Sequence, residues 1–255
     1  TNCNTCGSVS QAFGELMYLV HGNNLNIDVE RIESDLNSKF VEYVLNYYED
    51  LIYATNSLIN YNILGLVFGN PDEKNALICF DCMGFEEWNV IKEYLEKTMN
   101  FDFDIKYSFS MLPSETNYSR NALFAGLTPK NIRDLRSINE IHWRNEGGLF
   151  KHYLNERIGI DSNLVYFQKC VDAKDIKLDY SSADDYSAIG LVFSFVDRLV
   201  HANLMNKSRL IHNIRMHLEK SNIDEFIKSL LYQGFRVYFA SDHGNIFCKG
   251  NGINV

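Results

Sequence analysis

The chain has 255 residues, of which 46 % are apolar, and a formal net charge of −9. A chain of this size can bury a substantial core, so we expect one large globular domain, alone or with a small appendage. The acidic balance argues against a broad surface that coats nucleic acid. No apolar run approaches the ~20 residues of a membrane helix, the polar start is unlike a signal peptide, and the cysteines do not form a disulfide framework. We therefore expect a cytoplasmic protein with no membrane association.

The N-terminal region is predicted to be helical. Apolar residues recur at helical spacing between residues 28 and 62, with charges between them, which predicts an amphipathic packing helix. We expect residues 1–62 to be an N-terminal helical segment or a linker from an upstream domain. Residues 63–67 are expected either to end this region or to form a short strand.

The cysteines at the start of the chain have a spacing that metal sites use. Cys3 and Cys6 form a CxxC, which can be half of a zinc knuckle, and the other CxxC is formed by Cys79 and Cys82. A zinc ion shared by the two pairs is one alternative. The favoured alternatives are plain residues, or the remnant of a site that was cut at a fragment boundary. The chain begins without Met, so we expect it to be a fragment of a longer protein.

Three strongly apolar runs, each predicted to be a buried strand, are followed by an aspartate. The runs and their aspartates are 75–80 with Asp81, 188–196 with Asp197, and 235–240 with Asp242. In open α/β sheets, ligands bind at the carboxyl ends of the strands, so we expect these carboxylates to lie near a site. Taken alone, each aspartate has a plainer explanation as a turn or cap residue.

Two of these aspartates have a histidine at ligand spacing. Asp197 and His201 are four residues apart, so on a helix they share one face, which is the geometric basis of the zinc motif HExxH. Taken alone, this pair is more simply explained as a solvated carboxylate with a capping or core histidine. Asp242 and His243 can serve one metal ion only if the backbone turns sharply there, and Gly244 permits such a turn.

A proline-marked turn supplies a cluster of hydroxyl groups. Residues 103–109 alternate as a strand would and lead into this turn. Thr116, Ser119 and Arg120 follow it, at the start of a helix that is expected to stop at Gly126. A hydroxyl group at a helix N-terminus can meet a phosphate, because the free N–H groups and the helix dipole favour an anion there. The alternative is that Thr116 or Ser119 only caps the helix.

Two further stretches bear on the ligand. Residues 127–188 form a long irregular stretch, which we expect to be an insertion that covers a site, with one more possible strand at 164–168. Residues 207–220 are locally basic in an acidic protein, which suits an anionic ligand.

The order of these motifs resembles the PglZ domain, a branch of the alkaline phosphatase superfamily. That superfamily has an Asp after a first strand, a Thr or Ser nucleophile, a D-x-x-x-H, a D-H pair that ends a strand, and a last His. The matching residues are Asp81, Thr116 in its Pro-Ser-Glu-Thr turn, Asp197 with His201, and Asp242 with His243 in S-D-H-G. No histidine follows His243, so the resemblance implies a domain over residues 63–255 that is incomplete at its C-terminus.

The resemblance implies an α/β, alkaline phosphatase-like fold: a mostly parallel central sheet flanked by helices, with an inserted cap region at about 127–188. It also implies two zinc ions in a complete domain, of which this chain is expected to hold one. The first ion would be held by Asp81, Thr116, Asp242 and His243. The second would be held by Asp197, His201 and the missing histidine.

The expected function is a metal-dependent phosphoryl hydrolase with Thr116 as the nucleophile. Arg120 is expected to bind a phosphate oxygen, or alternatively to be a surface arginine. We favour a zinc-dependent phosphodiesterase that acts on a nucleotide or oligonucleotide, because the basic stretch 207–220 and the long insertion suit a larger anionic substrate. The resemblance also implies a role in signalling or in phage defence. The alternatives are a phosphomonoesterase in phage defence and a non-catalytic regulatory module of the same fold. The expected partners are the phosphate-ester substrate and other domains of a longer chain.

Overall fold

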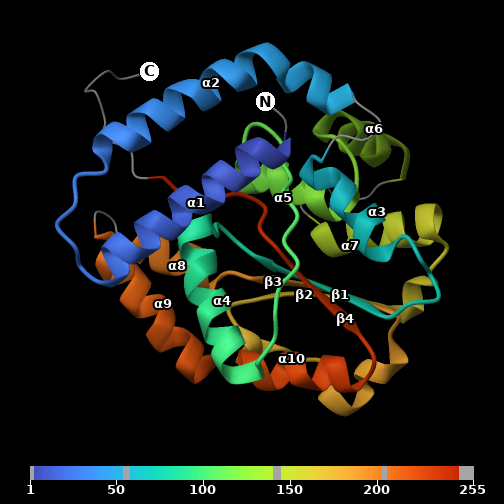
Figure 1. The fold of residues 1–255 in the computed structure, drawn as a ribbon. Helices are drawn as coiled ribbons and strands as arrows, with labels where there is room; N and C mark the ends of the chain where they lie inside the picture. Colours follow the sequence, from blue (N-terminus) through green and yellow to red (C-terminus); the bar gives the residue numbers. More distant parts are fainter. Residues whose placement is uncertain (1–2, 54–57, 140–144, 203–205, 247–255) are drawn as a thin grey trace.

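A computed structural model describes residues 3–53, 58–139, 145–202 and 206–246, and its centre is a parallel sheet (Figure 1). The four strands lie in the order β2-β3-β1-β4, and every neighbouring pair is parallel. Their bounds are β1 Asn75–Phe80, β2 Val165–Cys170, β3 Ala188–Phe193 and β4 Arg236–Ala240. The predicted α/β class with a parallel central sheet flanked by helices is confirmed.

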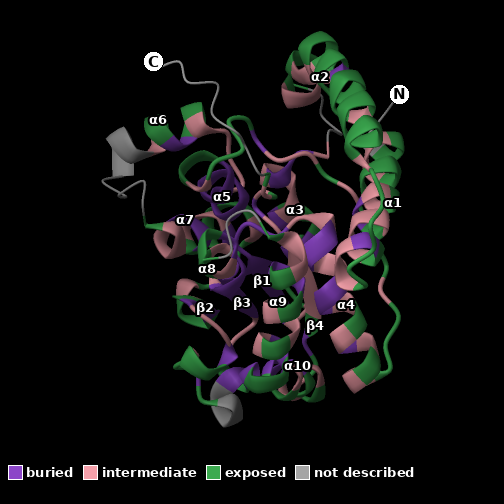
Figure 2. Cartoon of the chain, turned by 90° about the vertical axis from the view of Figure 1, so that its left-hand side faces the viewer, coloured by how far each residue is buried: buried purple, intermediate pink, exposed green. Residues whose placement is uncertain are grey.

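The two central strands are buried along their whole length. All six residues of β1 and all six of β3 are buried, whereas β4 at the sheet edge is only partly covered (Figure 2). Strands that are covered on both faces need continuous apolar runs, which is the pattern that 75–80 and 188–193 show. Because the strands are parallel, the residues that follow β1, β3 and β4 lie at the same edge of the sheet.

Helices cover both faces of the sheet. Alternate strand residues point to opposite faces, so Ile78 and Phe80 pack in one core, and Leu77 and Cys79 in the other. The first core includes residues of α4 Phe85–Met99, α8 Phe195–Ala202, α9 Lys207–Ser221 and α10 Ile223–Tyr232. The second includes residues of α3 Ile63–Phe68, α5 Thr116–Ala125 and α7 Glu146–Tyr153. The helix α6 Pro129–Asn139 and the π-helical turn Leu154–Ile158 follow α5 and α7, and short 3-10 turns lie at 60–62, 162–164, 173–175 and 180–185.

Two N-terminal helices precede the sheet. The first, α1 Cys3–Gly22, lies in the segment 1–62, for which the sequence left a helical segment or a linker as alternatives, and it packs against α4 and α9. A Cβ at Gly14 would lie 2.4 Å from Cβ of Phe85, so the close approach of α1 to α4 requires glycine. The second, α2 Glu30–Tyr53, confirms the predicted helix and buries Tyr43 against Phe109. Among the helices described, none is both long enough and apolar enough to cross a membrane.

Three local predictions differ from the structure. Residues 63–67 form α3, so the strand alternative was wrong. Residues 103–109 form no strand of the sheet: Phe109 makes one isolated bridge to Ile59. The stretch 127–188, expected to be irregular apart from a possible strand at 164–168, contains α6 and α7, and the possible strand is the edge strand β2 of the sheet itself.

Candidate metal centre

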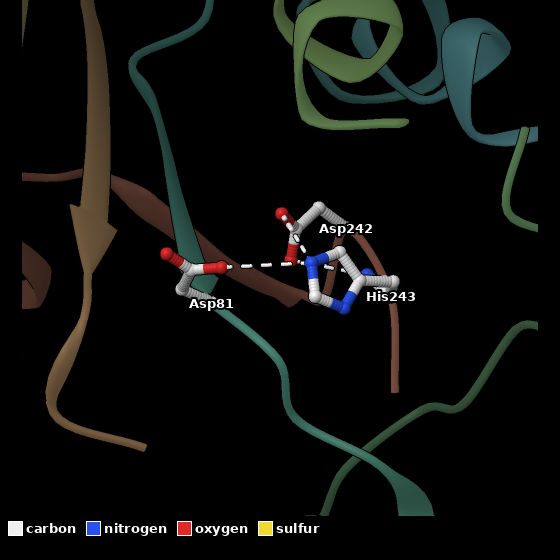
Figure 3. Close-up of side chains that lie close together, drawn as sticks. All are labelled: Asp81, Asp242 and His243. Carbon is white, nitrogen blue, oxygen red and sulfur yellow. Dashed lines mark hydrogen bonds and ion pairs between the residues drawn. The ribbon is translucent and has the colours of Figure 1, made fainter. Parts of the chain in front are cut away.

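Two neighbouring strands bring three candidate ligands together. Asp81 directly follows β1, and Asp242 and His243 follow β4, which is hydrogen-bonded to β1. One ligand atom from each of the three residues lies within 4.8 Å of the others (Figure 3). Nε2 of His243 is 3.8 Å from Oδ1 of Asp81 and 3.6 Å from Oδ2 of Asp242. The parallel pairing of β1 with β4 therefore brings together ligands from two distant parts of the chain.

Thr116 faces this cluster from the first turn of α5. Its Oγ1 lies 2.9 Å from Nε2 of His243. The N-cap residue of α5 is Glu115, and the Ser119 hydroxyl donates to the backbone carbonyl of Asp242 at 2.5 Å. Neither hydroxyl group therefore acts as the helix cap, and both are directed toward the loop that carries Asp242 and His243.

The hydrogen bonds of His243 set its tautomer. Nδ1 lies 2.9 Å from the backbone carbonyl of Gly244, which can only accept, so Nδ1 carries the hydrogen. In the neutral ring, Nε2 then has a free lone pair and accepts from the Thr116 hydroxyl. A histidine that donates one ring N–H to a carbonyl and offers the other nitrogen is oriented as metal-ligating histidines are.

Asp81 and Asp242 each use one carboxylate oxygen in hydrogen bonds, and the structure describes no hydrogen bond to the other oxygen. Oδ1 of Asp242 accepts from the backbone N–H groups of Cys82 and His243, at 3.2 and 3.0 Å. Oδ2 of Asp81 accepts from Arg120 at 2.5 Å. In the part of the chain that the structure describes, the buried atoms Oδ1 of Asp81 and Oδ2 of Asp242 have no hydrogen-bond partner.

These two oxygens fit a divalent cation. A buried carboxylate oxygen without a partner is costly, and a cation bound between Asp81, Asp242 and His243 would satisfy both. Burial, with a smaller contribution from Asp81, raises the pKa of Asp242 to about 6, while His243 and Arg120 oppose this shift. The donors are two carboxylate oxygens, one imidazole nitrogen and one hydroxyl oxygen, a set that transition metals such as zinc accept.

Arg120 lies inside the site and is only 2 % exposed. Its Nη1 contacts Asp81 and lies 3.7 Å from Oδ2 of Asp242, and its Nε donates to Glu146 at 2.8 Å. Burial by itself would lower the pKa of Arg120, but Glu146, Asp81 and Asp242 together raise it above the ordinary value. The guanidinium group therefore stays charged and neutralises part of the carboxylate cluster.

Glu146 is a site residue that the sequence did not identify. It is the first residue of α7, in the stretch between the hydroxyl turn and β2, and no motif marks it. Its carboxylate meets Arg120 because α7 packs against α5. Only the tertiary packing of two helices brings this charge to the sheet edge.

Asp197 and His201 share a face of α8, but they lie outside the buried cluster. Nε2 of His201 is 3.3 Å from Oδ1 of Asp197, as the four-residue spacing predicts. The His201 side chain is 74 % exposed and that of Asp197 is 31 % exposed. The group of described residues that could hold a metal ion contains Asp81, Asp242 and His243, and it includes neither of these two residues nor any cysteine.

Comparison with known families agrees with the order of motifs. Residues 65–255 match the family described as the BREX system PglZ alkaline phosphatase-like domain. No curated protein matches the chain. The match covers well over half of the chain, including every candidate site residue from Asp81 to His243.

Proposed function

The chain belongs to the PglZ family of alkaline phosphatase-like domains, and we propose that it is a metal-dependent phosphodiesterase with a threonine nucleophile. The observation that carries this proposal is the position of Thr116. Its hydroxyl group is hydrogen-bonded to Nε2 of His243, beside two buried carboxylate oxygens without hydrogen-bond partners. A nucleophile beside a charged ligand cluster at the start of a helix is the arrangement that attack on a phosphate requires.

Zinc is the ion that we propose for this site. Asp81, Thr116, Asp242 and His243 would hold it, and histidine ligation disfavours magnesium. When bound, the ion would lower the pKa of the Thr116 hydroxyl and stabilise negative charge on the phosphate. Asp197 and His201 would form a second, weaker site, because two protein ligands rarely hold zinc tightly.

The residues of this chain would then divide the reaction into two displacements. Oγ1 of Thr116 forms a bond to phosphorus while the bond from phosphorus to the leaving ester oxygen breaks, and the proton that the Thr116 hydroxyl loses is balanced by the proton that the departing alcohol gains. Water next attacks the phosphothreonine, which releases the phosphate product and restores the hydroxyl group. Two nitrogens of Arg120 are held by Asp81 and Glu146, so Nη2 is the nitrogen that we assign to a phosphate oxygen.

A nucleotide-type diester is the substrate class that we favour. The basic stretch 207–220 supports an anionic substrate larger than phosphate. Lys207 and Arg215 are ion-paired with acidic residues of α4, so the support comes from the exposed residues Arg209 and Lys220. A phosphomonoesterase in phage defence is the alternative within the same chemistry.

A non-catalytic regulatory module is the second candidate, and one contact favours it. Arg120 is ion-paired with Asp81 and lies near Asp242, so the carboxylates are partly neutralised without any metal ion. A module of this kind would keep the fold, and the site would serve its stability.

Hydrolysis assays on metal-loaded protein distinguish the two candidates. The protein would be stripped with a chelator, reloaded with zinc, and assayed with a bis-aryl and a mono-aryl phosphate. We expect zinc-dependent turnover that is faster with the bis-aryl ester. A faster rate with the mono-aryl ester would indicate the monoesterase, and zinc binding without turnover of either ester would indicate the regulatory module.

A further inference from the structure

The strand β4 has one hydrogen-bonding edge that faces away from the sheet. The backbone N–H of Arg236 donates to the carbonyl of Lys74, just before β1. Since backbone groups alternate in direction along a strand, the N–H and C=O groups of Val237 and Phe239 point away from β1. Within the described ranges, no backbone hydrogen bond to another segment reaches these outward groups.

A second stretch of backbone runs opposite this edge. Residues 101–106, in the connection from α4 to α5, are neither helix nor strand, and no backbone hydrogen bond is formed by them among the described residues (Figure 1). The ring of Phe103 lies 6.0 Å from that of Phe239. A cavity of about 650 Å³ is lined by both stretches, and we name it the β4 slot. Unpaired backbone therefore borders the slot on two sides.

Apolar side chains line the slot on both faces of the sheet. Leu66 and Val67 of α3 line it on the face where Tyr238 points, and Trp88 and Met99 of α4 line it on the face where Phe239 points. Leu66 is 58 % exposed and Phe101 is 44 % exposed, so large apolar surfaces remain open to whatever enters. An occupant that matches both faces has apolar side chains on alternate sides, as a buried strand of a parallel sheet does.

We propose that the β4 slot binds an extended polypeptide strand of a partner protein, apolar on both faces, which adds to the sheet beside β4. Main-chain hydrogen bonds to Val237 and Phe239 would supply affinity, as in other cases where a peptide adds to a sheet edge. An apolar small molecule would fill the volume but leave the outward backbone groups unpaired.

The charges at the rim define the ends of the partner strand. Asp102 and Asp104 are exposed and line the slot. Lys106 is the one lysine or arginine among the described residues that line it, so the rim has a net negative charge. Basic residues that flank the apolar core of the partner strand would therefore be favoured. The same carboxylates disfavour a second copy of this chain as the occupant, because edge-to-edge pairing would bring two acidic rims together.

Binding of a synthetic peptide tests the proposal directly. The probe is the labelled peptide KVIVIVK, and its control is KVIPIVK, whose central proline cannot continue a strand. Fluorescence anisotropy with the 255-residue protein should show binding of the first peptide and at least about tenfold weaker binding of the second. Hydrogen exchange of the Val237 and Phe239 amides should slow when KVIVIVK is bound. Equal binding of the two peptides, no binding, or a dimer that excludes the peptide would overturn the proposal.

Variants of the edge separate backbone pairing from apolar contact. Val237→Pro removes an outward N–H but keeps the hydrogen bonds between β4 and β1, and Val237→Ala loses a similar apolar contact but keeps the N–H. We expect the proline variant to bind KVIVIVK about tenfold more weakly than the alanine variant. The exposed pair Asp102→Lys and Asp104→Lys, made together, should reverse the preference from KVIVIVK to EVIVIVE. The double variant still tests the proposal if the proline variant fails to fold. If the double variant still bound KVIVIVK more tightly than EVIVIVE, Asp102 and Asp104 would not contact the ends of the partner strand.

Discussion

Thr116 and His243 are 127 residues apart in the chain, and Oγ1 of the first lies 2.9 Å from Nε2 of the second. When the His243 ring is neutral, Nδ1 donates to the carbonyl of Gly244 and the Thr116 hydroxyl donates to Nε2. The hydroxyl group of Thr116 is thus held against the histidine of the cluster that also contains Asp81 and Asp242. A group held in this way is positioned before any substrate arrives, which is the condition for efficient nucleophilic attack.

Removal of this hydroxyl should abolish activity and leave the fold intact. We predict that Thr116→Ala loses turnover of a bis-aryl phosphate by at least about a thousandfold, since no other group would form the bond to phosphorus. Thr116→Ser keeps an oxygen at the same position and should retain measurable activity. Ser114→Ala is the matched control, because Ser114 is exposed two residues earlier in the same turn. If Ser114→Ala were inactive and Thr116→Ala stayed active, the nucleophile would be Ser114 and the assignment to Thr116 would be wrong.

The buried cluster should hold one zinc ion per chain more tightly than any other site. Asp242→Asn keeps the shape of the side chain but removes the charge beside Asp81 and His243, so we predict an affinity for zinc that is lower by about a hundredfold or more. Isothermal titration calorimetry measures the affinity and the stoichiometry together. His201→Ala is the control, since His201 lies outside the cluster and should leave the tight site unchanged. Two equally tight ions in the wild-type protein would contradict the predicted difference between the sites.

His217 gives the free energy of unfolding a dependence on pH. Its ring stacks on Phe195 at 4.4 Å, and burial lowers its pKa below the ordinary value of 6.5, while Asp172 opposes and Lys174 assists the shift. As the pH falls below 6.5, the unfolded chain binds a proton that the folded protein still excludes. The stability contributed by His217 is therefore present above this pH and is lost as the pH falls through the folded pKa.

Replacement of His217 by phenylalanine isolates this contribution. His217→Phe keeps an aromatic ring against Phe195 but cannot titrate, so urea unfolding between pH 7.5 and about 5 should show a smaller loss of stability than in the wild type. His212→Gln, on the exposed side of the same helix, serves as the control for removal of a histidine. Parallel pH profiles for His217→Phe and the wild type would rule out the assigned role.

The sequence was informative where one local pattern determines one element. The continuous apolar runs at 75–80 and 188–196 predicted β1 and β3, because strands covered on both faces require such runs. The second prediction extended too far: β3 ends at Phe193, and the apolar residues Phe195 and Val196 belong to α8. The helix predicted to stop at Gly126 does so, since this residue has a φ of +60° that favours glycine. The alternation of apolar and polar residues over 103–109 predicted a strand wrongly. Such alternation indicates which side chains are covered, but it does not indicate whether the backbone is hydrogen-bonded to a neighbouring strand.

The site was predictable in part for the same reason. Asp81, Asp242 and His243 come directly after strands, so the parallel sheet necessarily places them at one edge. Glu146 reaches the site through the packing of α7 on α5, which depends on contacts that no local pattern encodes. The environment of Arg120 escaped prediction for this reason, since both of its strongest partners lie in other elements.

Arg120 should matter more to stability in the absence of metal than in its presence. Removal of its charge leaves the buried carboxylate of Asp81 and the partly buried carboxylate of Glu146 without their cation, and one-sided disruption of a buried ion pair costs about 3–5 kcal/mol. We predict a loss of this size for Arg120→Met in urea unfolding of the metal-free protein. Arg215→Met is the matched control, because the Arg215 side chain is 40 % exposed and its ion pair with Glu93 should contribute about 1 kcal/mol or less.

Zinc should restore much of the stability that Arg120→Met loses. An ion bound to Asp81 and Asp242 supplies positive charge to two of the carboxylates that the guanidinium group neutralises in the wild type. The increase in the unfolding midpoint on addition of zinc should therefore be larger for Arg120→Met than for the wild type, measured at equal protein and zinc concentrations. Equal increases would mean that Arg120 and the ion act on separate groups, and a smaller increase in the variant would mean that Arg120 positions the ligands for the ion. Only a larger increase in the unfolding midpoint of Arg120→Met would support the view that zinc and the guanidinium group neutralise the same carboxylates.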